Sequence, residues 1–128
     1  MPMGHYALVG QTPVPVDDVI EWARWFETAD RVVRQERFLD LATVSTVFLG
    51  LDHAFGRCRA PVLFETMVFW QDEGGYEQDR CCTWLEAEEM HRRMAREVTR
   101  PRAVLAYAWR ACAGAIAAAR ADWGQNVA

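Results

Sequence analysis

The sequence predicts an α+β domain, in which an antiparallel sheet of three to five strands is packed by two helices and followed by a C-terminal Ala-rich helix. Residues 44–51 and 62–70 predict the sheet, because both runs are rich in Val, Phe, Leu and Thr and a Gly- and Pro-containing connection separates them. Amphipathic stretches at 18–29 and 84–98 predict the helices. Both strands are apolar at odd and even positions, so we expect a helix on one face and a second helix or a second chain on the other.

Composition narrows the class of protein. The chain has 128 residues, 52% of them hydrophobic and 25% charged, as in an ordinary globular domain. A net charge of −4 disfavours direct nucleic-acid binding as the main role. No run reaches the ~20 apolar residues of a membrane span, so we expect a cytoplasmic protein without membrane contact. The four Cys lack a C-x-x-C spacing and the three His lack a ligand pattern, which predicts reduced thiols and neither metal nor cofactor.

The N-terminal third predicts two outer elements. Residues 5–9 form an expected short strand, after which Pro13 and Pro15 disfavour a helix and most positions in a sheet. Residues 31–38 mix two Val with charged side chains, which predicts an edge strand because charges discourage pairing with other chains. A meander is the simplest way to connect this strand to the two central ones.

Each predicted helix begins with a capping box, Asp18 with Glu21 in the first and Thr83 with Glu86 in the second. The first helix directs an apolar stripe toward the core, made of Val19, Trp22, Ala23, Phe26 and Ala29. The stripe of the second helix is made of Ala87, Met90, His91, Met94 and Val98. Between the strands and this helix, residues 71–79 predict an exposed loop and residues 80–82 a short strand.

The tail predicts a separate element, so we divide the chain into a core domain at 1–99 and a helical extension at 100–128. Pro101 opens the tail helix and Gly124 is its expected cap. Apolar side chains recur at alternating spacings of four and three, which defines the seam: Leu105, Trp109, Cys112, Ile116, Ala119 and Trp123. This seam is expected to dock on the protein's own sheet or on a second copy, and a homodimer is the favoured arrangement.

The connection between the two central strands carries five candidate ligand-binding residues: Asp52, His53, Phe55, Arg57 and Arg59. One interpretation is a site for a small anionic, nucleotide-like ligand, and another is a small hydrolase that uses Asp52, His53 and Glu65. The structural interpretation is that Asp52 starts a turn and His53 packs at the end of the sheet.

Two other titratable groups are expected to have structural roles. Glu65 lies in mid-strand, where a carboxylate is costly unless paired, so Arg34 or Arg37 of the edge strand is its expected partner. His91 lies on the apolar stripe of the second helix, which favours a hydrogen-bonded core histidine over a ligand-binding one.

Charge changes sign along the second half of the chain. Acids dominate from residue 72 to 89, and Arg dominates from 92 to 102. The plain interpretation is a solvated helix whose charges follow its dipole. The functional interpretation is an acidic, partner-binding surface that occupies the basic groove of a nucleic-acid-binding protein. Its candidate residues are Asp72, Glu73, Glu77, Asp79, Glu86 and Glu89.

Three motifs carry a resemblance to a known family: PVPVDDVIEWARWFETADR, VSTVFLGLDHAFG with PVLFETMVF, and RCCTWLEAEEMH. Over about residues 6–98 the chain resembles a family of small proteins that is widespread in phages and prophages. It departs from the family pattern at 70–72, where WQD replaces a Gly-rich turn, at Cys81, and in the tail from Arg100.

The resemblance implies a context and no catalytic residue. Small acidic phage proteins of this kind imply a non-enzymatic counter-defence inhibitor in the host cytosol. Its expected partner is a host defence protein, such as the CRISPR effector subunit that an anti-CRISPR protein binds.

Overall fold

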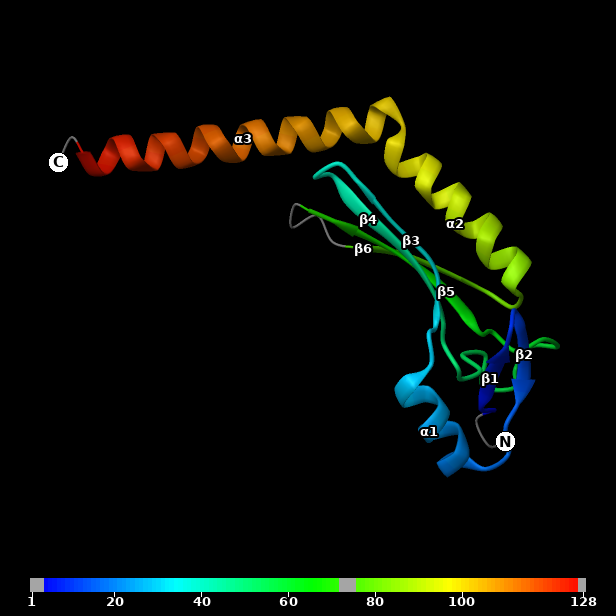
Figure 1. Ribbon diagram of the computed structural model, residues 1–128. Coiled ribbons are helices and arrows are strands. Elements are labelled where there is room, and N and C mark those ends of the chain that lie inside the picture. Colours follow the sequence, from blue (N-terminus) through cyan, green and yellow to red (C-terminus); the bar gives the residue numbers. More distant parts are fainter. Residues whose placement is uncertain (1–3, 72–75, 127–128) are drawn as a thin grey trace.

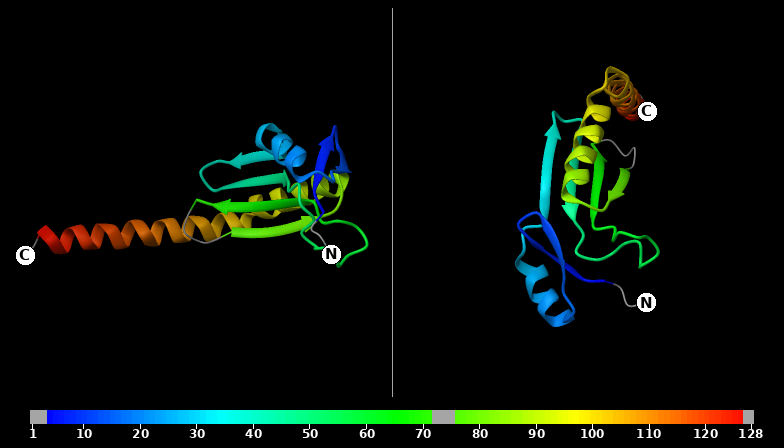
Figure 2. Two further views of the ribbon diagram at one scale, coloured as in Figure 1. Left: turned by 90° about the horizontal axis from the view of Figure 1, so that it is seen from below. Right: turned by 90° about the vertical axis from the view of Figure 1, so that its right-hand side faces the viewer.

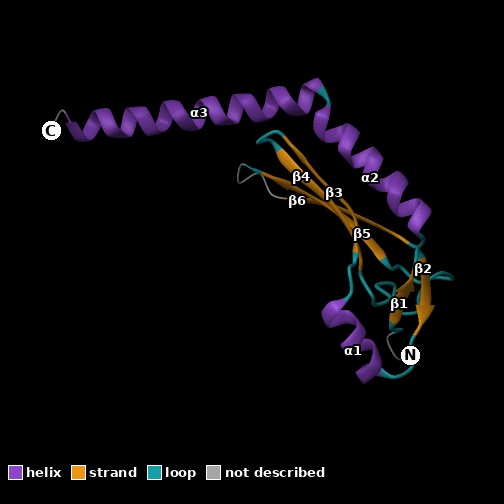
Figure 3. Cartoon of the chain, viewed as in Figure 1, coloured by secondary structure: helices purple, strands orange, loops and turns teal. Residues whose placement is uncertain are grey.

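The computed structural model describes residues 4–71 and 76–126, and it has the predicted α+β class. The elements are β1 (Tyr6–Val9), β2 (Thr12–Pro15), α1 (Val19–Thr28), β3 (Val32–Phe38), β4 (Ala42–Phe48), β5 (Phe64–Trp70), β6 (Tyr76–Cys81), α2 (Trp84–Thr99) and α3 (Pro101–Asn126). Strands β1 and β2 form an antiparallel ribbon (Figure 1). Strands β3 to β6 form a four-stranded antiparallel meander, in agreement with the expected three to five strands (Figure 3).

The ribbon corrects the expectation for the two prolines, because both lie in β2. Pro13 pairs with Leu8 and Pro15 with Tyr6. Proline is compatible with an edge strand, where the position of its missing N–H faces away from the neighbouring strand. The amide of Tyr6 donates to the carbonyl of Gly50 at 2.8 Å, which joins the ribbon to the segment after β4.

Side chains of the meander alternate between a covered and an open face. In β4 the even-numbered residues from Ala42 to Phe48 are buried, and the residues between them are half-buried. Helix α2 packs on the even-numbered face through a buried stripe, which confirms the prediction: Ala87, Met90, His91, Met94 and Val98. No helix of residues 4–71 and 76–126 packs on the other face, so the expected second helix is wrong there. A second chain is the other cover that the sequence predicted.

The core has two parts that lie along α2. Under the C-terminal half of α2 the buried residues are Leu41, Ala42, Val44, Val68, Met90, Met94 and Val98. Near the N-terminal end they are Phe48, Leu63, Phe64 and Ala87, and the ribbon adds Tyr6 and Leu8. Burial of each large apolar side chain contributes roughly 1.5–3 kcal/mol, so these clusters hold the ribbon, the sheet and α2 together.

Helix α1 begins as predicted, since the carboxylate of Asp18 accepts from the amides of Ile20 at 2.9 Å and Glu21 at 3.2 Å. Its packing face is different from the predicted stripe. Val19 and Ala23 are exposed, because the wide side chains beside them make the contacts instead.

Three aromatic residues make those contacts. Trp22 Nε1 donates to the Tyr6 carbonyl at 3.0 Å, and Trp25 packs edge to face on Phe48 with 6.0 Å between ring centroids. Phe26 lies beside Trp22, with 4.8 Å between their ring centroids. Helix α1 therefore packs on the ribbon and on the end of the sheet, and it does not lie across the broad face of the sheet.

Strand β6 begins earlier than predicted, because residues 76–79 belong to the strand and not to a loop. Glu65 of β5 lies opposite Arg80, and Met67 lies opposite Gln78. The acidic composition suggested a loop, but an edge strand tolerates charges well. Gly74 and Gly75 lie outside the described residues.

Helices α2 and α3 meet at Arg100, whose backbone is extended with φ −62° and ψ 141°. Pro101 causes this break, because proline disfavours helical geometry in the residue before it. Tyr107 donates to the carbonyl of Asp40 at 2.9 Å and ties the first turns of α3 to the body. The helix then continues through Gly124 to Asn126, so the expected cap at Gly124 is wrong. Figure 2 shows that α3 projects far beyond the sheet.

Candidate functional site

The loop after β4 is held by Asp52, which is buried. Its carboxylate accepts from three backbone amides: those of Ala54 at 2.9 Å, Gly56 at 3.0 Å and Val62 at 2.9 Å. Burial raises the pKa of Asp52, but these hydrogen bonds and the nearby His53 outweigh it, and the pKa is lowered from its usual value. The ionised carboxylate therefore closes the loop, as the structural interpretation predicted.

The remaining loop residues lie at the surface. His53 donates from Nδ1 to the Leu51 carbonyl at 2.9 Å. Phe55 is about half exposed and adopts a left-handed backbone with φ 53°. Its ring centroid lies 6.0 Å from the Arg57 guanidinium and 6.4 Å from the His53 ring. The structure thus brings His53, Phe55 and Arg57 together, while Arg59 is exposed elsewhere on the loop.

Glu65 pairs with β6, and the predicted pairing with β3 is wrong. Its Oε2 accepts from Arg80 Nε and from Gln78 Nε2, both at 2.8 Å. In the meander β4 separates β3 from β5, so Arg34 and Arg37 bond to acids near them in sequence instead. Glu65 is nearly buried, and this pairing compensates for its loss of water.

The hydrolase interpretation requires Asp52, His53 and Glu65 to act together. Asp52 instead bonds to backbone amides, His53 to a backbone carbonyl and Glu65 to side chains of β6. Within the described part of the chain, no hydrogen bond joins any two of the three. Among the residues that the structure describes, no group of three His, Cys, Asp or Glu is placed to hold a metal ion. All four Cys are free, and burial together with the nearby Glu86 raises the pKa of Cys81 to about 11, so it is a thiol at neutral pH.

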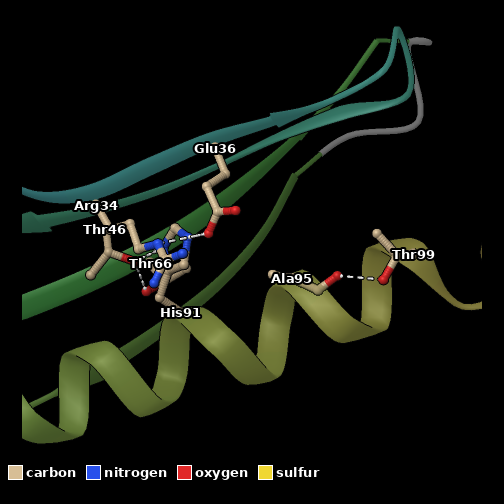
Figure 4. Close-up of polar contacts among 7 residues, drawn as sticks. All are labelled: Arg34, Glu36, Thr46, Thr66, His91, Ala95 and Thr99. Carbon is tan, nitrogen blue, oxygen red and sulfur yellow. Dashed lines mark hydrogen bonds and ion pairs between the residues drawn. The ribbon is translucent and has the colours of Figure 1, made fainter.

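His91 is fully buried and links α2 to the sheet (Figure 4). Its Nε2 lies 2.9 Å from a carboxylate oxygen of Glu36, and its Nδ1 lies 2.7 Å from the hydroxyl of Thr46, which lies 2.5 Å from that of Thr66. A carboxylate only accepts, so Nε2 carries the proton and Nδ1 accepts from Thr46. Burial lowers the pKa of His91 more than Glu36 raises it. The expected core histidine is confirmed.

The open face of the sheet carries apolar side chains among polar ones. In register, Val32 of β3 lies beside Val47 of β4, while Met67 and Phe69 of β5 lie beside Ser45 and Thr43 of β4. Val32 and Phe69 are 45% and 46% exposed. We call these four residues the open-face cluster, and the Glu65–Arg80 pair lies on the same face. The sequence signalled this surface through apolar residues at odd positions, but the prediction assigned them to a covered face.

The candidate acidic residues gather beside α2, where Arg residues interleave with them. Asp79, Glu86 and Glu89 line a hollow of about 300 Å³ between β6 and α2, together with Arg80 and Arg93. Asp79 pairs with Arg93.

Two further candidate acids, Glu89 and Glu86, have partners in α2 or at its cap. Glu89 pairs with Arg92 at 3.0 Å and Arg96 at 3.6 Å, and Glu86 bonds to the helix-capping residue Thr83. Glu77 lines a second hollow, of about 580 Å³, at the corner of α2 and α3. Asp72 and Glu73 lie outside the described residues.

The seam of α3 is exposed along its whole length. Its large side chains are Leu105 (69% exposed), Trp109 (78%), Ile116 (55%) and Trp123 (74%). Cys112 and Ala119 between them are also exposed. The seam therefore does not dock on the sheet of its own chain, which was one of the two expected arrangements.

Comparisons with known proteins identify no relative: no family model matches the chain, and no curated protein or solved structure is similar to it. The described helices include none with the length and hydrophobicity of a membrane span.

Proposed function

We propose that the chain is a non-enzymatic inhibitor of phage or prophage type that binds a host defence protein in the bacterial cytosol. A CRISPR effector subunit is the proposed class of target. The phage context and the target come from the sequence motifs within residues 6–98. The mode of action, binding by protein–protein contact, is supported by the surface of the sheet.

The observation that carries the binding proposal is the open-face cluster. Protein interfaces combine apolar and polar contacts, and this face carries Val32, Val47, Met67 and Phe69 among Thr43, Ser45 and the Glu65–Arg80 ion pair. The cluster lies on rigid strands, so its side chains are already positioned for a partner and little entropy is lost on binding.

The acidic residues beside the sheet add a preference for a basic partner. Glu77 and Asp79 are exposed on the edge strand β6, opposite Val68 and Thr66, so their side chains lie on the α2 side of the sheet, where Asp79 pairs with Arg93. Charges outside the contact area still raise the association rate with an oppositely charged partner, and salt screens that effect. Glu77→Gln with Asp79→Asn is expected to slow association and to weaken its salt dependence, with little change in dissociation.

A plating assay tests the proposal in cells whose CRISPR system targets a phage. Expression of the wild-type chain is expected to restore plating. Phe69→Arg with Val32→Arg is expected to abolish this effect at unchanged melting temperature, since both residues are already half exposed. Leu85→Arg, at an exposed apolar residue of α2, is the matched control and should remain active.

Two outcomes would count against it. If the wild-type chain leaves plating unchanged, the counter-defence role is wrong. If the double variant protects the phage as well as the control does, the open face is not the binding surface.

The cluster of His53, Phe55 and Arg57 favours a second candidate, a protein that sequesters a small anionic, nucleotide-like ligand. An aromatic ring beside a guanidinium and an imidazole suits a base and a phosphate. A mononucleotide pool should then raise the melting temperature, because it binds only the folded state. Arg57→Ala should abolish the rise and Arg59→Ala, outside the cluster, should preserve it. No rise with wild-type protein would rule this candidate out.

A further inference from the structure

We propose that α3 joins two copies of the chain in an antiparallel two-helix coiled coil built on the seam. This inference uses different residues from the open-face cluster and does not depend on the proposed function. The seam leaves two Trp, one Leu and one Ile more than half exposed on a single helix face. Apolar patches of that extent are unusual on a monomer and mark interaction surfaces.

The seam points away from the body of its own chain. Tyr107 and Ala103, the half-buried residues of α3, face the body, and Tyr107 bonds to Asp40. Leu105 and Trp109 are each two residues from Tyr107, which places them about 160° around the helix from it, at 3.6 residues per turn. A partner helix can therefore reach the seam along its length without displacing any contact of the body.

Side-chain volumes select the antiparallel direction. In an antiparallel pair centred at the height of Gly114, each seam residue meets the residue of the second copy that lies equally far on the other side of Gly114. Leu105 then packs against Trp123 of the second copy, Trp109 against Ala119, and Cys112 against Ile116. Each layer combines a larger with a smaller side chain, which fills space evenly.

A parallel pair packs the same residues poorly. Each seam residue would meet its own copy, so Trp109 and Trp123 would form two overfilled layers. Cys112 and Ala119 would form two underfilled ones. Overpacking and cavities in an apolar core are both destabilising, so the parallel arrangement is disfavoured.

Helix length and charge support the same direction. The helix runs from Pro101 to Asn126, so a centre near Gly114 overlaps the two helices almost completely. Seventeen of the 18 acidic residues precede α3, whose own charges are Arg102, Arg110, Arg120 and Asp122. An antiparallel pair places the two acidic bodies at opposite ends of a rod about 39 Å long, at 1.5 Å per residue. A parallel pair would place them side by side, where they repel each other.

The residues that flank the seam allow close approach of the helices. Ala106, Ala108, Ala113 and Ala115 lie beside it, and the exposed charges Arg120 and Asp122 lie only near its end. With two Trp, a Leu and an Ile on each helix, burial removes roughly 800 Å² of surface from water, since a Trp alone covers 150–250 Å². The flanking Ala bring the interface near the ~1,000 Å² of a specific contact, so we expect a dimer at micromolar concentrations.

Light scattering on the full-length chain tests for the dimer. A mass of twice 14.6 kDa is expected. Trp109→Glu with Ile116→Glu should return the mass to 14.6 kDa with unchanged circular dichroism of the sheet. The matched control is Ala111→Glu with Ala118→Glu, which has the same seven-residue spacing on the opposite face of α3 and should stay dimeric. A monomeric wild-type chain, or a seam variant that remains dimeric, would overturn the proposal.

Disulfide trapping tests the direction in a Cys58→Ser background, which removes the other exposed Cys. Ile116→Cys should give a covalent dimer on mild oxidation, because it meets Cys112 of the second copy. The parent with Cys112 alone should give little, since the two Cys112 lie in different layers. Strong cross-linking of the parent and none gained by Ile116→Cys would show a parallel pair and refute the antiparallel geometry.

Discussion

The buried histidine of α2 offers a sharp test of how the helix is fastened to the sheet. His91 receives a hydrogen bond from Thr46 and donates one to Glu36, and Thr66 continues the chain through Thr46 (Figure 4). Substituting His91→Leu removes both bonds at similar volume. Substituting Thr46→Val removes the bond between Thr46 and His91 from the Thr46 side. The double variant removes both residues of that bond.

The structure sets the expected magnitudes. His91→Leu should lower the free energy of unfolding by about 2 kcal/mol, since two hydrogen bonds are lost, one of them to a charged group. Thr46→Val should cost about 2 kcal/mol, because it leaves a buried nitrogen of His91 and the Thr66 hydroxyl without their partner. The double variant should cost only about 2–3 kcal/mol, because each single variant already loses the bond between Thr46 and His91. Urea unfolding at pH 7.5 measures all three, and additive costs would refute a shared network.

The same group gives a pH dependence with a definite sign. Burial lowers the pKa of His91 in the folded protein, so below about pH 6.5 the unfolded chain binds more protons than the folded one. The contribution of neutral His91 to stability is complete above that pH and is lost as the pH falls toward the folded pKa. His91→Leu should flatten this part of the profile. Stability that rises on acidification through pH 6 in the wild-type protein alone would contradict the assignment.

Three further substitutions test other contacts by urea unfolding. Asp52→Ala should lower the free energy of unfolding by about 3 kcal/mol, because three amides lose a charged acceptor, and Asp52→Asn should cost less. Gly50→Ala should cost about 1–3 kcal/mol, since φ is 77° and a Cβ would lie 3.1 Å from the Phe26 ring; no loss would show that the turn relaxes freely. Arg80→Met should cost about 1–3 kcal/mol by leaving Glu65 with one partner, and a gain would show that the pair is replaceable.

Local features were predictable from the sequence because neighbouring residues determine them. The caps at Asp18 and Thr83 form as expected, since each depends on a side chain and an amide three residues later. The buried stripe of α2 follows directly from its helical period. His91 was recognised as a core residue for the same reason, although its partners Glu36 and Thr46 required the fold.

Contacts between strands were less predictable, because they depend on strand order. Glu65 has basic side chains available on two sides of the sequence, Arg34 before it and Arg80 after it. Glu65 pairs with Arg80 because β6, and not β3, is the neighbour of β5 in the sheet. Composition misled the assignment of residues 76–79, since acids favour a loop on average but are also tolerated in an edge strand.

The two surfaces that the structure leaves open share one physical origin. A hydrophobic period shows that a face is to be buried, but it does not show whether its cover comes from the same chain or from another. Phe69 and Val32 satisfy the pattern of a covered sheet, and Trp109 and Ile116 satisfy that of a covered helix, yet all four are exposed in one chain. Because the two faces lie on separate elements, separate partners can cover them. We therefore propose a second copy for the helix, whose seam residues pair by size in an antiparallel arrangement, and a different protein for the sheet, whose apolar residues have an ion pair beside them.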